Sequence, residues 1–224
     1  MADRVVPRRI TPNEAGRGSG ARYLALGDSY TIGEQVEPAQ RWPAQLVSLL
    51  RQEGLGVADP EIIARTGWTT RDLIAGIEST APRGRFDLVS LLIGVNNQYQ
   101  GRDVEEYRSE FRGILARAVA FAGGAAGRVI VVSIPDWGAT PFAKGRDRAR
   151  IADEIDLFNA VNREESERAG ARYVDVTGIS SLSGAPGGES LVVSDGLHPT
   201  GAMYAEWARR ILPQALVALG RTAG

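Results

Sequence analysis

The sequence predicts an α/β fold in which helices cover both faces of a single five-stranded parallel sheet. From Tyr23 onward, short apolar runs alternate with longer amphipathic segments. No internal repeat or change in composition divides the 224 residues. This alternation is typical of parallel strands joined by helical crossovers, and a chain of this length can bury a full core. We therefore expect one domain over residues 21–224, preceded by a flexible N-terminal arm over residues 1–20.

The five expected strands are apolar runs that end at turn residues. The first covers residues 23–26 and is broken by Gly27 and Asp28. Pro135 closes the fourth, because proline has no N–H to give to a sheet. The remaining strands are expected over residues 60–66, 86–93, 128–134 and 171–176.

The expected helices carry apolar residues at helical spacing. Asp103 and Glu106 resemble a capping box at the start of the most regular helix, in which Tyr107 and Phe111 belong to the apolar face. Gly170 is expected to end another helix. The other helices are expected over residues 38–53, 69–79 and 148–169, with a last helix after Pro199 and a Ser/Gly-rich loop over residues 177–194.

Composition excludes several classes of function. A net charge of −1 gives no electrostatic basis for binding nucleic acid. The chain has no cysteine and one histidine, and we see no suitable carboxylate cluster, so we expect no metal and no cofactor. No apolar run reaches the length of a membrane span, and residues 1–20 lack the apolar segment of a secretory signal. We therefore expect a cytoplasmic protein with no integral membrane contact; its oligomeric state stays open.

Ser29 lies directly after the first strand, at the edge of an α/β sheet where ligands collect. A serine in a Gly-Asp-Ser turn is more often a helix cap than a nucleophile. However, His198, the only histidine, follows Asp195 by three residues and precedes Pro199. His198 can accept the proton of Ser29, and Asp195 can orient the imidazole. Asp195 also has a simpler interpretation as the cap of the last helix.

Gly67 and Asn96 stand at the ends of the second and third expected strands. Because parallel strands end at one edge, both residues can converge with Ser29. The backbone N–H groups of Ser29 and Gly67 and the amide of Asn96 then become candidate donors to an oxyanion. Taken alone, Gly67 is better explained as a turn residue, and the alternative for Asn96 and Asn97 is that they only form an Asx turn.

In order along the chain, four blocks resemble the motifs of the SGNH (GDSL-like) hydrolases: residues 27–30, Gly67, residues 94–97 and residues 195–199. The resemblance covers about residues 23–207. It implies a flavodoxin-like three-layer α/β/α sandwich and ester hydrolysis through an acyl-enzyme. It further implies that Ser29 is the nucleophile, that Gly67 and Asn96 are oxyanion donors, and that Asp195 and His198 complete the triad. Asn97 stands where the family usually has aspartate.

The substrate is expected to be a small-molecule ester. Candidate pocket residues are Asp28, Asn97 and the loop aromatics Trp68, Tyr99, Trp137 and Phe142. Apolar aromatics favour an acyl chain, which indicates a lysophospholipase or thioesterase type of carboxylic ester hydrolase. Aromatic rings also stack on sugars, so a carbohydrate O-acetylesterase is the alternative enzyme. A catalytically silent flavodoxin-like binding module is the alternative from another class. An α/β-hydrolase is excluded, because the chain contains no Gly-x-Ser-x-Gly.

Overall fold

A computed structural model describes residues 20–180 and 191–221. Within these residues one parallel sheet has the strand order β2-β1-β3-β4-β5. The strands are β1 (Tyr23–Gly27), β2 (Glu61–Ala64), β3 (Leu88–Leu92), β4 (Val129–Val132) and β5 (Arg172–Val174). The predicted five-stranded α/β fold is confirmed. The predicted arm, except Gly20, and most of the predicted Ser/Gly-rich loop lie outside the described residues.

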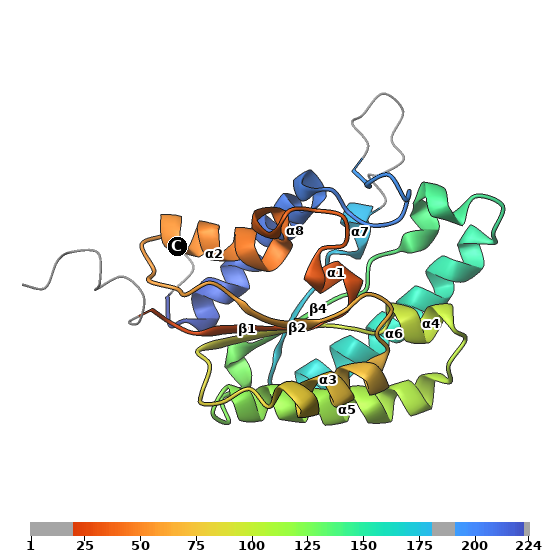
Figure 1. Cartoon of the computed structure of the whole chain (residues 1–224). Helices are drawn as coiled ribbons and strands as arrows, with labels where there is room; N and C mark the ends of the chain where they lie inside the picture. Colours follow the sequence, from red (N-terminus) through yellow and green to blue (C-terminus); the bar gives the residue numbers. More distant parts are fainter. Residues whose placement is uncertain (1–19, 181–190, 222–224) are drawn as a thin grey trace, which may run out of the picture.

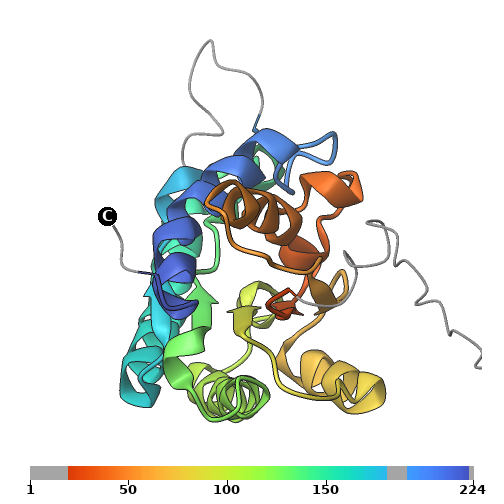
Figure 2. The same ribbon diagram turned by 90° about the vertical axis from the view of Figure 1, so that its left-hand side faces the viewer.

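Helices form a layer on each face of the sheet (Figures 1 and 2). Helices α2 (Trp42–Gln52) and α8 (Gly201–Ala218) lie side by side on one face. Helices α3 (Thr70–Thr80), α5 (Val104–Phe121) and α6 (Arg148–Ala169) cover the other. This is the three-layer α/β/α arrangement that the resemblance implied.

The strands at the centre of the sheet are buried along their whole length. Every residue of β1, β3 and β4 is buried. A strand covered on both faces reads as a continuous apolar run instead of an alternating one, which is why these segments were recognisable in the sequence. One polar pair is accommodated inside, where the Tyr23 hydroxyl and Ser90 Oγ lie 2.8 Å apart.

Several predicted helix boundaries are confirmed, and two details are corrected. Helix α6 covers the predicted residues and ends at Gly170, whose φ of 74° is left-handed. Asp103 caps α5 through the N–H groups of Glu105 and Glu106, but the expected capping box is incomplete, because the Glu106 carboxylate pairs with Arg71 of α3. The expected helix over residues 38–53 is divided into a 3₁₀ turn η1 (Pro38–Gln40) and α2.

Residues 94–97, where the third expected strand was to end in a turn, instead contain the start of a short helix, α4 (Val95–Tyr99). Gly94 precedes it with a φ of 125°, a backbone conformation that side-chain-bearing residues rarely adopt. Helix α7 (Thr177–Ser180) opens the segment that was expected to be a loop. Across residues 20–180 and 191–221, no helix is both long and apolar enough to span a bilayer.

Candidate active site

Three consecutive strand ends meet at one edge of the sheet. Gly27 of β1 pairs with Ala64 of β2 and with Leu92 of β3, so the three strands end at the same level. Helix α1 (Ser29–Ile32) begins after β1, and α4 follows β3 (Figure 1). As a result, Ser29, Gly67 and Asn96 line one pocket of about 220 Å³, and His198 also lines it.

The sharp turn after β1 fixes the position of Ser29. A Cβ at Gly27 would collide with the Thr31 side chain and the Leu92 carbonyl, so the turn requires glycine. The Asp28 carboxylate caps α1 by accepting a hydrogen bond from the Tyr30 N–H (3.0 Å). Ser29 is the first residue of α1, a position whose N–H has no acceptor within the helix. Among the described residues no other group accepts this N–H either, so it can bind a ligand.

Asp28 is fully buried beneath Ser29. Burial raises the pKa of this carboxyl from 3.8 to about 7, although hydrogen bonds from backbone N–H groups act in the opposite direction. Its second oxygen has no hydrogen-bond partner among the described residues. Asp28 thus supports the turn from below and does not line the pocket.

Asp195 holds the ring of His198 through Nδ1. The His198 Nδ1 and Asp195 Oδ2 atoms lie 2.7 Å apart. The other carboxylate oxygen accepts hydrogen bonds from the N–H groups of Leu197 (2.8 Å) and His198 (3.0 Å). Burial raises the pKa of Asp195, but the hydrogen bonds from His198 and Leu197 outweigh it and leave the pKa below its ordinary value. An ionised Asp195 places the imidazole proton on Nδ1, which leaves Nε2 as an acceptor.

The interpretation of Asp195 as a cap of the last helix does not match the structure. Helix α8 is capped by Thr200, whose hydroxyl accepts from the Met203 N–H. Asp195 instead closes a tight turn that ends on His198, and the His198 carbonyl accepts a hydrogen bond from the Val193 N–H (2.8 Å).

Gln35 is a contact of Asp195 that the sequence analysis missed. Its amide nitrogen donates to Asp195 Oδ2 (3.0 Å), and its amide oxygen accepts from the Ser194 hydroxyl (2.9 Å). Gln35 has a φ of 60°, which is uncommon for a residue with a side chain. Nothing in the local sequence marks this residue, because its partners lie about 160 positions away.

The oxyanion candidates Gly67 and Asn96 are joined through Trp68. Gly67 has a φ of 82°, and its N–H donates to no other described group. The Asn96 amide donates one hydrogen to the Trp68 carbonyl (2.9 Å), which leaves its second hydrogen available. The Gly67 N–H and the second amide hydrogen of Asn96 are therefore two available donors on residues that line the pocket.

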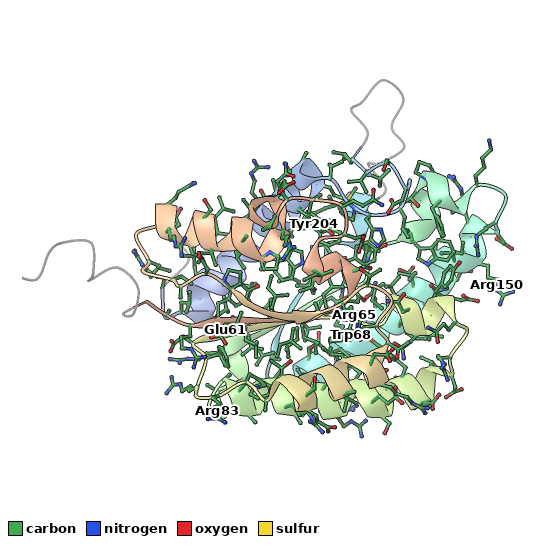
Figure 3. The ribbon with its side chains drawn as sticks, viewed as in Figure 1. Glu61, Arg65, Trp68, Arg83, Arg150 and Tyr204 are labelled. Carbon is green, nitrogen blue, oxygen red and sulfur yellow. The ribbon has the colours of Figure 1, made fainter. Side chains whose placement is uncertain are left out.

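Three of the predicted pocket residues lie elsewhere, and three line the pocket. Trp68 packs against Gly76 of α3, on the face of the sheet that α3, α5 and α6 cover (Figure 3). Asn97 is buried and makes two hydrogen bonds to Thr70, because one step along helix α4 turns its side chain away from Asn96. Asp28 is the third. Tyr99 and Trp137 do line the pocket, as does Phe142.

The pocket also has walls that the sequence analysis did not identify, formed by Tyr30, Thr66, Val95 and Leu197. The Tyr30 ring lies 5.4 Å from the His198 ring, centroid to centroid. Trp137 is held in place by Gln98, whose side-chain oxygen accepts the indole N–H (2.8 Å). Most of these walls are apolar, so the pocket suits an uncharged acyl group.

The sequence matches the profile of the GDSL-like lipase/acylhydrolase family over residues 25–206. The chain belongs to this family. It is accordingly a serine-dependent carboxylic ester hydrolase. Its SGNH resemblance, inferred from four short blocks, is thereby confirmed. No curated protein matches the sequence at a significant level.

Solved structures share the fold at low sequence identity. The crystal structure of TesA is 20% identical with a TM-score of 0.69, over 88% of this chain and 99% of that one. Axe2, an acetylxylan esterase from Geobacillus stearothermophilus, is 22% identical with a TM-score of 0.67, over 92% and 96% of the two chains. A lipolytic G-D-S-L family member from Veillonella parvula is 17% identical with a TM-score of 0.63, over 85% and 96%.

Proposed function

We propose that the chain hydrolyses carboxylic esters or thioesters of apolar acyl groups, with Ser29 as nucleophile, His198 as general base and Asp195 as the residue that orients His198. The observation that carries this proposal is the shared pocket of Ser29 and His198, together with the 2.7 Å contact between His198 Nδ1 and Asp195 Oδ2.

In the first half-reaction, His198 Nε2 accepts the proton of Ser29 as Oγ attacks the ester carbonyl carbon. The carbonyl oxygen becomes an oxyanion, which the N–H groups of Ser29 and Gly67 and the free amide hydrogen of Asn96 stabilise. The protonated His198 then gives its proton to the departing alcohol or thiol, and the acyl group stays on Ser29. Asp195 stabilises the imidazolium without accepting its proton.

In the second half-reaction, His198 accepts a proton from water, and the resulting hydroxide oxygen attacks the acyl-enzyme. The same three donors stabilise the second oxyanion. Collapse of this intermediate breaks the bond to Ser29 Oγ, which regains a proton from His198. The carboxylic acid loses its remaining proton to water and leaves as carboxylate, and the free enzyme is restored.

The lining of the pocket supports a lysophospholipase or thioesterase type of substrate. Val95, Tyr99, Trp137, Phe142 and Leu197 surround the space next to Ser29. Burial of each methylene group against such walls contributes about 0.8 kcal/mol, so activity should rise with acyl length until the pocket is filled. A panel of p-nitrophenyl esters from acetyl to palmitoyl tests this, with an optimum beyond acetyl as the expected result.

A carbohydrate O-acetylesterase is the second candidate. Tyr99 lines the pocket and is 47% exposed, so its ring can stack on a sugar, and Axe2 is an acetylxylan esterase of similar fold. A steep preference for the acetyl ester in the same panel would support this candidate over the first.

Labelling with a fluorophosphonate tests the assignment of the nucleophile. We expect one adduct, which peptide mass mapping should place on Ser29, and no adduct in Ser29→Ala. Ser48→Ala is the matched control, because Ser48 is exposed on α2 and should leave labelling and hydrolysis intact. A chain that neither reacts with the probe nor cleaves any ester would be a binding module.

A further inference from the structure

A second hollow, which we call the outer groove, borders the Ser29 pocket. It has a volume of about 640 Å³ and lies between the segment after α4 and the start of α6. Tyr99 and Trp137 line both the outer groove and the Ser29 pocket, so the two share a wall. If the acyl group of an ester occupies the pocket, the outer groove is placed to receive the alcohol or thiol part of the same molecule.

Charged side chains distinguish the outer groove from the apolar pocket. Six line it: Arg102, Asp103, Arg146, Asp147, Arg150 and Glu154.

The three carboxylates of the groove already have partners. Glu154 accepts hydrogen bonds from Arg150 and Gln98, both at 2.7 Å. Asp103 and Asp147 accept backbone N–H groups at the starts of α5 and α6. Each carboxylate of the groove therefore already has hydrogen-bond donors within the protein. Arg150, on the outer side of α6, is likewise paired with Glu154 (Figure 3).

Arg146 differs from Arg150 because no carboxylate of the described residues lies within ion-pair distance of it. Within the described part of the chain, the one hydrogen bond of its guanidinium group is to the Tyr99 hydroxyl (3.2 Å). Its guanidinium carbon lies 5.4 Å from the ring centroids of Tyr99 and Trp137 and 5.5 Å from that of Phe142. Contact with ring faces holds a guanidinium group without using its N–H donors, so most of its five donors remain available to a ligand.

The aromatic rings around Arg146 are themselves fixed. Gln98 accepts the indole N–H of Trp137, and the Tyr99 and Trp137 rings meet edge to face with centroids 5.4 Å apart. Because these rings also border the Ser29 pocket, Arg146 is held at the boundary between the pocket and the outer groove. A planar fork of N–H donors at a fixed position matches the oxygens of a phosphate group.

We propose that Arg146 binds a phosphate group carried by the alcohol or thiol part of the substrate, and that the chain therefore prefers esters whose leaving group is phosphorylated. This inference rests on the proposed ester hydrolysis at Ser29. Arg102 lies in the same groove and adds positive charge there; among the described residues, the side chain that accepts hydrogen bonds from its guanidinium is Gln100.

Two pairs of substrates with the same acyl group test the proposal and separate the sources of the phosphate. The first pair is a 1-acylglycerol and its 3-phosphate, and the second is an S-acyl pantetheine and its 4′-phosphate. For each pair the measured quantity is the ratio of kcat/KM for the phosphorylated ester to that for the neutral ester. We expect a ratio well above one in at least one pair, and the pair with the larger ratio identifies the source.

Arg146→Gln should lower that ratio by roughly tenfold to a hundredfold, the usual effect of a hydrogen bond between charged groups. Lys144→Gln is the matched control. It removes the same charge from the same exposed segment, but Lys144 does not line the groove. It should leave the ratio nearly unchanged.

A ratio near one in both pairs would overturn the proposal, as would an equal fall of the ratio in Arg146→Gln and Lys144→Gln. In either case hydrolysis of the neutral esters would leave the proposed function standing. Failure to hydrolyse any of the four esters or the p-nitrophenyl panel would instead contradict the proposed function itself.

Discussion

The Gln35 amide donates a hydrogen bond to Asp195 Oδ2, the same oxygen that contacts His198 Nδ1. Gln35 therefore lies behind the Asp195–His198 pair as a positioning residue. It ties the loop after α1 to the turn that carries Asp195, and through its oxygen it also holds Ser194. The segments that bear Ser29 and His198 are thereby linked by side chains as well as by packing.

The first prediction concerns the charge next to Asp195. Gln35→Glu places a second carboxylate beside Asp195, which stabilises the imidazolium of His198 and moves the acidic limb of kcat/KM to higher pH. Gln35→Met removes the donor at similar size and should reduce kcat/KM several-fold. The pH profile separates the two effects. Gln52→Glu, which adds the same charge at the exposed end of α2, is the control. If the acidic limb of kcat/KM does not move in Gln35→Glu, Gln35 does not act on the Asp195–His198 pair.

The strands and their polar ends could be predicted because they depend on local sequence. A buried parallel strand is a continuous apolar run, and the residue after it must lie at the carboxyl edge of the sheet. These two facts were enough to bring Ser29, Gly67 and Asn96 together. The histidine followed because the chain has only one.

Gln35, Gln98 and the position of Asn97 could not be predicted, for a different reason. Gln35 contacts a residue 160 positions away, and Gln98 contacts Trp137 and Glu154 from distant elements. Such contacts depend on how elements pack, which no local pattern records. Asn97 was misplaced because the segment was expected to be a turn, whereas in helix α4 adjacent residues point in different directions.

The second prediction uses the adjacent residues Asn96 and Asn97 as each other's control. Asn96→Ala removes a candidate oxyanion donor and should lower kcat by roughly 10²- to 10³-fold. Asn97→Ala removes two buried hydrogen bonds to Thr70 and should lower the free energy of unfolding by about 1–3 kcal/mol, with the smaller loss of kcat. Steady-state kinetics and urea unfolding of both variants check this. A larger loss of kcat in Asn97→Ala would show that Asn96 is not the oxyanion donor.

The third prediction concerns the buried carboxyl of Asp28. Its pKa is about 7 in the folded protein and near 3.8 when exposed. Below pH 3.8 it is neutral in both states. Between these values it ionises mainly in the unfolded chain. The contribution of Asp28 to the free energy of unfolding therefore falls as the pH rises towards 7 and then levels off. Asp28→Asn removes this dependence.

The free energy of unfolding of Asp28→Asn, taken relative to wild type, should therefore be higher at pH 8 than at pH 5 by roughly 2–3 kcal/mol. Urea unfolding of both proteins at the two pH values measures the difference, and effects common to both proteins cancel. Parallel pH dependences would mean that Asp28 stays ionised in the folded protein.

The last prediction rests on His198 being the only histidine in the chain. If His198 is the general base, its ring must be neutral before Ser29 can lose a proton, so the acidic limb of kcat/KM reports the titration of this ring in the free enzyme. The imidazole resonances of a single histidine can be followed by NMR without ambiguity of assignment. We expect the NMR midpoint and the kinetic midpoint to agree, and we expect Asp195→Asn to lower both, because a neutral amide no longer stabilises the imidazolium. Two midpoints more than about one pH unit apart, a tenfold difference in protonation, would exclude His198 as the base.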